Sequence, residues 1–244
     1  MYYLPLCPFM KILFSSISLF LFAVSGLLSK PDDELLKIEN AAPEKSSVKP
    51  KKTRKVLVYS HPSGFKHSSI PTGVKGLRVL AEKTQAFEAT FTLETKEFTS
   101  EGLKKYDAII FNNTTHVQKA FTEKSQRDAI LNFIRNGKAF IGFHAASDGG
   151  MSQWQEYTDM IGGCFAGHPW NAGGKWPFFV EDSGHPVNQA FQEKEFMFSD
   201  EIYQYKAYDR SKLRVLIGLD SVKTDKKGNS KTNDYPVSWV RSYG

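Results

Sequence analysis

Residues 106–148 read YDAIIFNNTTHVQKAFTEKSQRDAILNFIRNGKAFIGFHAASD, and this stretch decides the fold. Two short apolar runs, Tyr106–Phe111 and Lys138–Phe143, have the length and continuity of strands buried on both faces. The residues between them, 121–136, repeat apolar side chains at helical spacing, with Thr122 as a candidate cap and Gly137 as a stop. A strand, an amphipathic helix and a second strand in this order predict neighbouring parallel strands.

The same alternation extends in both directions along the chain. Towards the N-terminus, 55–60 (KVLVYS) predicts a strand, a helix follows from Ser68 or Ser69 to about Lys83, and 87–93 predicts another strand. Towards the C-terminus, a short helix is expected around Tyr157, closed by two glycines. The pattern therefore predicts an α/β fold with a doubly wound, mostly parallel sheet and helices on both faces.

Beyond Gly167 the chain is rich in strand patterns. We expect these strands to extend the same sheet rather than to form a separate domain. They cover residues 176–181, 196–205, 214–220 and 236–240.

The N-terminal segment has the features of a targeting sequence. Lys11 precedes an uncharged, largely apolar run over 12–28, and Ala23 and Ser25 fit a small-residue cleavage site. We expect residues 1–29 to be a signal peptide and the protein to be exported to the periplasm or the extracellular space; an uncleaved membrane anchor is the alternative. Residues 30–54 are polar and charged and predict a flexible linker.

The charge distribution argues against nucleic acid as a partner. The net charge is +6, but residues 30–55 hold eight basic and five acidic side chains, and residues from 56 onward hold 23 basic and 21 acidic ones. The body of the protein is thus almost neutral and lacks the excess of positive charge that phosphate binding needs. The chain has two cysteines, and only Cys164 lies after the signal, which leaves it no disulfide partner.

Polar residues follow each of the three apolar strands, at the sheet edge where open α/β sheets bind ligands. The first strand is followed by His61 and, six residues on, by His67. The second is followed by 112–116 (NNTTH), and the third runs directly into His144. His144 lies between small residues in a strand-to-helix turn that resembles a nucleophile elbow. It fits a general base, a metal ligand, a hydrogen-bond donor to substrate, or a purely structural loop contact.

Serine or cysteine would be required at this turn for acyl transfer, so that chemistry is disfavoured. Only one of the adjacent carboxylates Asp200 and Glu201 can reach the same cleft if their strand is regular. Together with His144 and His168, Glu201 could complete a metal site of two histidines and a carboxylate. Trp170 and Tyr203 are suited to stacking on sugar rings.

Seven short motifs, in order, resemble the ThuA-like (trehalose utilisation) family over residues 54–244. They are 64–70 (GFKHSSI), 111–115 (FNNTT), 142–148 (GFHAASD), 167–169 (GHP), 185–186 (HP), 200–203 (DEIY) and 236–239 (PVSW). The resemblance implies a flavodoxin-like fold of the class I glutamine amidotransferase-like superfamily, without the amidotransferase cysteine, and a role in carbohydrate metabolism. Family members usually continue beyond the last motif. Residues 55–244 therefore look truncated at the C-terminus, which would expose a sheet edge.

The leading functional hypothesis is an exported enzyme that acts on a trehalose-like glycoside or keto-sugar; whether it is a hydrolase, a lyase or an isomerase stays open. A non-catalytic carbohydrate-binding or sensing module and a metal-dependent hydrolase are the alternatives. We expect a small-molecule carbohydrate as partner, no nucleic acid, membrane contact only through an uncleaved N-terminus, and no cofactor unless a divalent metal binds; a homo-oligomer stays open. The predicted catalytic residues are His144, His67 and Glu201, and the predicted substrate-binding residues are His61, Asn112, Asn113, Thr114, His168, Trp170 and Tyr203.

Overall fold

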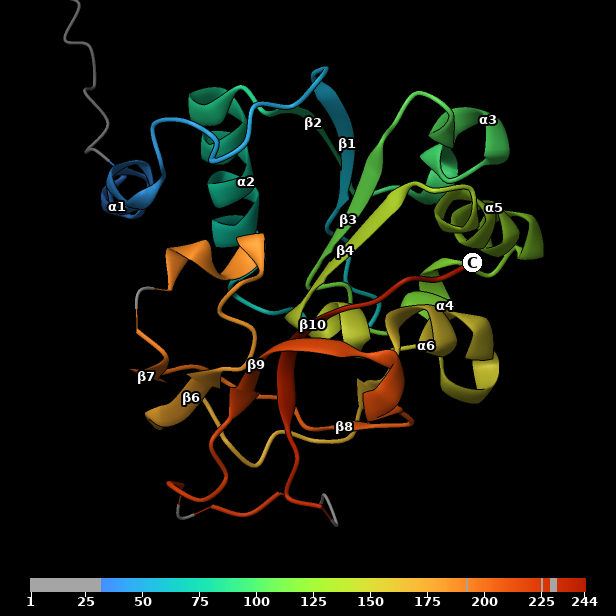
Figure 1. The fold of residues 1–244 in the computed structure, drawn as a ribbon. Helices are drawn as coiled ribbons and strands as arrows, with labels where there is room; N and C mark the ends of the chain where they lie inside the picture. Colours follow the sequence, from blue (N-terminus) through green and yellow to red (C-terminus); the bar gives the residue numbers. More distant parts are fainter. Residues whose placement is uncertain (1–31, 192, 225, 229–231) are drawn as a thin grey trace, which may run out of the picture. The chain divides into compact units, whose positions relative to one another are not determined.

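The computed structural model describes residues 32–191, 193–224, 226–228 and 232–244, so the predicted signal peptide lies outside the described residues (Figure 1). The first half of the fold contains α1 (Asp33–Ala41), β1 (Arg54–Tyr59), α2 (Ile70–Thr84), β2 (Phe87–Thr92), α3 (Ser100–Leu103), β3 (Ala108–Asn112), α4 (Val117–Ala120), α5 (Lys124–Arg135) and β4 (Ala139–Phe143). The second half contains α6 (Gln155–Ile161), β5 (Cys164–Phe165), β6 (Trp176–Val180), β7 (Glu195–Phe198), β8 (Tyr205–Lys206), β9 (Arg214–Leu219) and β10 (Pro236–Val240).

The first four strands form one parallel sheet in the order β2-β1-β3-β4. β1 pairs with β2 on one side and with β3 on the other, and β3 pairs with β4, all in parallel. Each connection between parallel strands carries at least one helix, as a crossover requires. The predicted α/β, flavodoxin-like sheet is therefore confirmed.

Helices cover both faces of this sheet (Figure 1). Side chains alternate along a strand, so Leu57 and Tyr59 of β1 join the core beneath α3 and α5. Val58 points the other way and packs in a second cluster with Leu77 of α2. Both clusters are buried, which explains why the central strands read as continuous apolar runs rather than as alternating ones.

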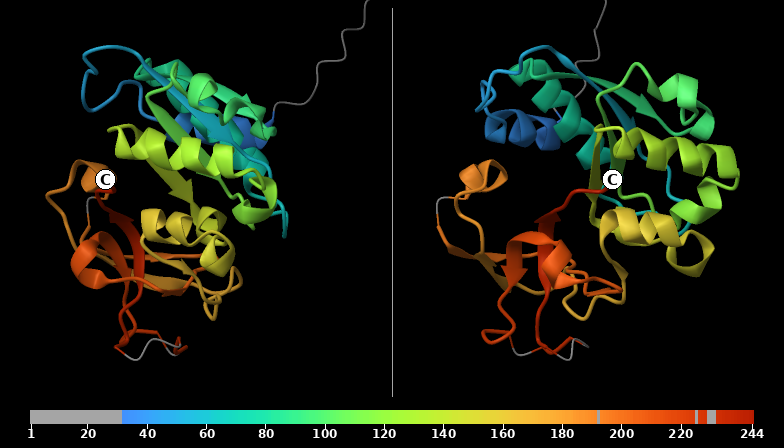
Figure 2. Two further views of the ribbon diagram at one scale, coloured as in Figure 1. Left: turned by 90° about the vertical axis from the view of Figure 1, so that its right-hand side faces the viewer. Right: turned by 45° about the vertical axis from the view of Figure 1, so that its right-hand side comes forward.

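Four of the C-terminal strands form a sheet of their own, and β8 pairs with β5 in a two-stranded sheet, which corrects the expectation that these strands extend the first sheet. The order of the four strands is β10-β9-β6-β7, and all their pairings are antiparallel. Trp170, Trp176 and Leu216 lie in the core of this second sheet. Figure 2 shows the sheet as a separate layer in the orange and red part of the chain. An apolar strand pattern indicates that a strand is buried, but it does not indicate which sheet the strand joins.

The predicted linker contains a helix, α1, where the sequence suggested no regular structure. Polar contacts with α2 hold it. Lys75 lies 2.7 Å from a carboxylate oxygen of Glu34, and the Lys83 ammonium donates to the carbonyl oxygens of Glu39 and Ala42. No side chain of α1 is buried, which explains why an apolar pattern did not reveal the helix.

One long edge of β4 is open, because β4 is the last strand of the first sheet. Its Ile141 is 42% exposed and its Phe143 is 37% exposed. A groove of about 600 Å³ runs along this strand and is also lined by residues 237–243, Gly244 and His144. Within the described part of the chain, no helix is long and apolar enough to cross a membrane.

Candidate functional site

His144 lies directly after β4 in a strained turn. Its φ of +46° falls in the left-handed region, which is unfavourable for a residue with a side chain. Two hydrogen bonds stabilise the turn: the Ser147 hydroxyl donates to the His144 carbonyl oxygen, and the buried Tyr157 hydroxyl donates to the Ala146 carbonyl oxygen. A Cβ atom on Gly142 would lie 3.1 Å from the Cβ of Ala146, so a small residue fits there best. The predicted elbow is thus an actual backbone feature.

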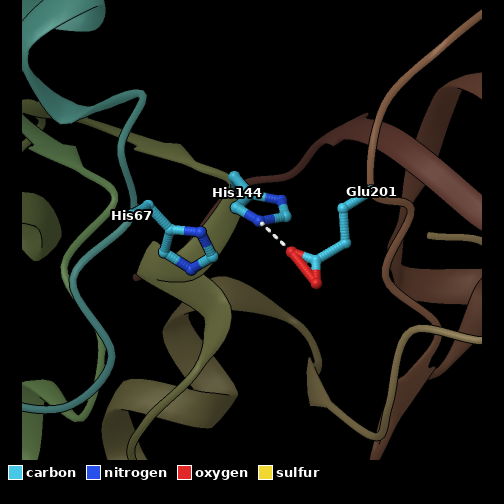
Figure 3. Close-up of side chains that lie close together, drawn as sticks. All are labelled: His67, His144 and Glu201. Carbon is cyan, nitrogen blue, oxygen red and sulfur yellow. Dashed lines mark hydrogen bonds and ion pairs between the residues drawn. The ribbon is translucent and has the colours of Figure 1, made fainter. Parts of the chain in front are cut away.

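His67 comes from the loop after β1 and reaches the same place. The loop is tied to the end of β3, because the Gly64 amide donates to the Thr115 hydroxyl and this hydroxyl donates to the Phe65 carbonyl oxygen. The His67 and His144 rings meet edge to face with their centroids 4.7 Å apart (Figure 3). The convergence of strand ends expected from the sequence therefore brings these two imidazoles together.

Glu201 reaches His144 from the segment between β7 and β8. This segment runs antiparallel to residues 164–170: the Ile202 amide donates to the Trp170 carbonyl oxygen at 2.7 Å, and the Gln204 amide donates to that of Gly167 at 2.9 Å. Alternation then buries Ile202 in the second core and turns Glu201 towards the histidines. One carboxylate oxygen of Glu201, Oε2, lies 3.2 Å from Nε2 of His144.

The second carboxylate oxygen of Glu201 is also engaged. Oε1 lies 3.2 Å from Nδ1 of His168, whose side chain is half exposed. Tyr203, two residues after Glu201, places its ring centroid 3.9 Å from that of His144 and its hydroxyl 3.3 Å from Nε2 of His67. One carboxylate, three imidazoles and one phenol thus form a connected polar cluster.

The electrostatics of this cluster favour a neutral His144. Burial lowers the pKa of the His144 imidazole, the neighbouring His67 lowers it further, and the Glu201 carboxylate opposes both effects. Burial and the nearby negative charge of Glu201 raise the pKa of Tyr203 well above its usual value, so its phenol stays protonated. At neutral pH, His144 therefore offers a nitrogen lone pair, while Tyr203 is a hydrogen-bond donor.

Five of the predicted site residues lie together in this cluster: His67, His144, His168, Glu201 and Tyr203. His61 is exposed at the end of β1, with its ring centroid 6.3 Å from that of Tyr59 rather than beside His144. Trp170 is fully buried, and its indole NH donates to the Lys226 carbonyl oxygen. Its ring cannot stack on a ligand in this arrangement, which corrects the predicted role.

The three polar residues at the end of β3 are buried beneath the surface. The side-chain amide of Asn112 donates to the Ser60 hydroxyl and to the Ile70 carbonyl oxygen, so it joins β1, β3 and the start of α2. Asn113 and Thr114 are 6% and 0% exposed. These residues support the loops that carry the cluster, and the structure does not place them on its open side.

Phe65 is the residue at this site that sequence reasoning missed. Its ring is 71% exposed and lies 4.9 Å, edge to face, from that of His67. A large apolar side chain held exposed at the margin of a polar cluster is a typical stacking surface for a sugar ring. The signal was available in the sequence, because Phe65 lies in a polar loop outside any apolar repeat.

Three side chains of the cluster have the spacing of metal ligands. One ligand atom from each of His67, His144 and Glu201 lies within 4.8 Å of the other two. The sequence suggested His144, His168 and Glu201 instead; here His168 contacts the carboxylate from the other side. The arrangement can therefore transfer protons or hold a cation.

Comparison with known proteins agrees with this architecture. The sequence model of the ThuA family, described as trehalose utilisation, matches residues 55–244. A ThuA-like protein from Bacteroides uniformis superposes with a TM-score of 0.65 at 22% identity, over 80% of this chain and 81% of that chain. The structure of SMU.1228c gives a TM-score of only 0.40 at 10% identity, over 66% and 67% of the two chains.

No curated protein matches the sequence. The family match covers the parallel sheet except Arg54 at the start of β1, the second sheet and every member of the histidine–carboxylate cluster. Over residues 55–244, the chain belongs to the ThuA family.

Proposed function

We propose that this protein is an enzyme of carbohydrate metabolism that acts on a glycoside or keto-sugar by proton transfer at His144. The observation that carries the proposal is the hydrogen bond between Nε2 of His144 and the Glu201 carboxylate, made by a histidine in a strained turn at the carboxyl end of a parallel strand. Strained backbone conformations concentrate at functional sites, since the surrounding structure has to maintain them. The family description, trehalose utilisation, supports a sugar as the substrate.

The geometry suggests how the cluster divides the work. If Nε2 of His144 carries a hydrogen and donates it to Glu201, the opposite nitrogen, Nδ1, has the lone pair that accepts a proton from the sugar. Glu201 then stabilises the imidazolium that forms, as the carboxylate does in other histidine-dependent active sites. Tyr203 is only 5% exposed and its hydroxyl lies 3.3 Å from Nε2 of His67, so it orients that imidazole, which corrects its predicted role in binding the sugar. The exposed ring of Phe65 provides an apolar surface for the sugar.

The experiment is a comparison of turnover and binding in the wild type and two variants. Trehalose and glycosides oxidised to a ring ketone are incubated with the wild type, His144→Ala and His185→Ala, and the products are followed by mass spectrometry. His185 is the control, because it lies in the turn before residues 186–190 and its Nδ1 accepts the Val187 amide. We expect turnover to fall by about 100-fold or more in His144→Ala, the usual contribution of a general acid–base group, while the sugar still binds.

Unchanged turnover in His144→Ala would remove His144 from the mechanism. Sugar binding without turnover by the wild type would favour the second candidate, a carbohydrate-binding or sensing module, for which the exposed Phe65 is the specific observation. Loss of both binding and turnover in the His185 variant would indicate a folding defect, which circular dichroism detects independently.

We also propose that the protein is exported. The support is the apolar run over residues 12–28 preceded by Lys11. Fusion of residues 1–54 to a reporter enzyme that is active only outside the cytoplasm tests this. The positive control is the same reporter fused to a known signal peptide. If this control is active but the fusion to residues 1–54 is inactive, export is contradicted.

A further inference from the structure

We propose that His67, His144 and Glu201 bind one divalent transition-metal cation, and that zinc is the ion that fits this set of donors best. The inference uses the same side chains as the proposed function, but it is tested by binding alone and does not require that a sugar is turned over.

The spacing of the donor atoms is close to what a cation needs. A tetrahedral zinc ion with bonds of about 2.1 Å keeps its ligand atoms about 3.4 Å apart. Nε2 of His144 and Oε2 of Glu201 are already 3.2 Å apart. All three ligand atoms lie within 4.8 Å of one another, so a side-chain movement of at most about 1.4 Å closes the site.

The donor types are those of a catalytic rather than a structural metal site. Two imidazoles and one carboxylate are a common set of three protein ligands for zinc, and they leave one position open for water or substrate. All three side chains are half-buried, which shields the site and still leaves a path for the ion. The three side chains come from three separate elements. His67 lies in the loop after β1, His144 at the end of β4 and Glu201 in the segment before β8.

The surrounding contacts have the form of an outer ligand shell. Nδ1 of His168 lies 3.2 Å from the second oxygen of Glu201. When Nδ1 of His67 binds the ion, Nε2 of His67 carries the hydrogen and donates it to the Tyr203 hydroxyl oxygen, 3.3 Å away. Outer-shell hydrogen bonds orient metal ligands, and their loss typically lowers metal affinity by about 10- to 100-fold. The strained turn at His144 fixes the direction of the third ligand.

A bound cation changes the chemistry at the proposed active site. His67, His144 and Glu201 would hold the cation, which would supply Lewis acidity towards a sugar carbonyl or a coordinated water. His144 would then be a metal ligand and would not accept the substrate's proton. The proton transfer proposed above therefore belongs to the metal-free protein, whereas the sugar-processing role is common to both states.

The test is a metal titration of the full chain, purified without a histidine tag and freed of metal with a chelator. Cobalt(II) chloride is added first, because a cobalt ion with nitrogen and oxygen ligands in a protein site absorbs visible light. Zinc chloride is then added, and its affinity and stoichiometry are measured by calorimetry. We expect one cation per chain and displacement of cobalt by zinc, as the general order of metal affinities predicts.

Variants identify the ligands. His67→Ala, His144→Ala and Glu201→Gln should each weaken zinc binding by at least about 100-fold, and His168→Ala by about 10- to 100-fold. His61→Ala is the matched control, because His61 is an exposed histidine on the loop that carries His67. The zinc affinity of this variant should equal that of the wild type. Circular dichroism confirms that each variant is folded.

The absence of stoichiometric zinc binding by the folded wild type would overturn the inference, and so would equal affinity in the wild type and Glu201→Gln. If zinc fails to bind but His144→Ala abolishes sugar turnover, only the metal site is refuted. If zinc binds as expected but neither trehalose nor a keto-glycoside is bound or converted, the metal site stands and the proposed function fails.

Discussion

Replacing His144 by glycine should yield a more stable protein than replacing it by alanine. Both substitutions remove the same imidazole, so the comparison isolates the backbone conformation of the turn, whose φ is +46°. A residue with a Cβ atom loses about 1–2 kcal/mol in the left-handed region. Glycine avoids this cost but loses about 0.4–1 kcal/mol through the greater freedom of the unfolded chain. The midpoints of these two ranges, about 1.5 and about 0.7 kcal/mol, give glycine a net advantage of about 0.8 kcal/mol.

Urea unfolding followed by fluorescence and circular dichroism measures this difference. For a domain of this size, 1 kcal/mol corresponds to a shift of about 2–4 °C in Tm, so thermal unfolding serves as a second measurement. The control is the same pair of substitutions at Gln153, an exposed position without a positive φ, where alanine should be the more stable variant. An alanine variant at position 144 as stable as the glycine variant would refute the idea that this turn is strained.

Three further substitutions separate the supporting structure from the site. Tyr59→Phe should raise the free energy of unfolding by about 1 kcal/mol, because the buried Tyr59 hydroxyl has no hydrogen-bond partner among the described residues; urea unfolding checks this. The backbone amide of Lys55, followed by nearby lysines, lowers the pKa of Asp107, so this carboxylate stabilises the fold above its unfolded pKa and the contribution is lost as the pH falls below about 4. Asp107→Asn should therefore flatten the acid side of a stability–pH curve. Asn112→Ala should lower the free energy of unfolding by about 1–3 kcal/mol, because the Ser60 hydroxyl and the Ile70 carbonyl oxygen lose their hydrogen-bond donor; urea unfolding measures this. A variant with the stability of the wild type that no longer binds sugar would instead indicate that Asn112 contacts the sugar.

The first sheet was predictable from the sequence because its strands are buried on both faces. Val58 of β1 and Ile110 of β3 belong to continuous apolar runs, which are typical of strands in a sheet covered by helices on both faces. Helix α5, which connects β3 to β4, carries a clear apolar stripe. The second sheet was recognised as strands but assigned to the wrong layer. Its paired residues lie 16 to 41 positions apart in the chain, and periodicity carries no information on such pairings.

The errors at the site follow from the same limit. His144 and His67 were identifiable because both follow parallel strands, and the carboxyl ends of these strands share one edge. Trp170 was misassigned because an aromatic residue in a loop looks the same in a sequence whether it faces a ligand or a core. In the structure, the bridge to Ile202 and the packing of the Trp170 ring place this residue in the core of the second sheet.

The pairing between residues 164–170 and 202–206 connects the second sheet to the histidine–carboxylate cluster. Along this segment, Ile202 is buried in the second core, while its neighbours Glu201 and Tyr203 face His144 from the first sheet. A shift of the segment by one residue would exchange the two faces and bury the carboxylate in an apolar core, at a cost far above the benefit of any surface ion pair. The packing of Ile202 therefore fixes the direction of Glu201, and the cluster forms only when both sheets are in place.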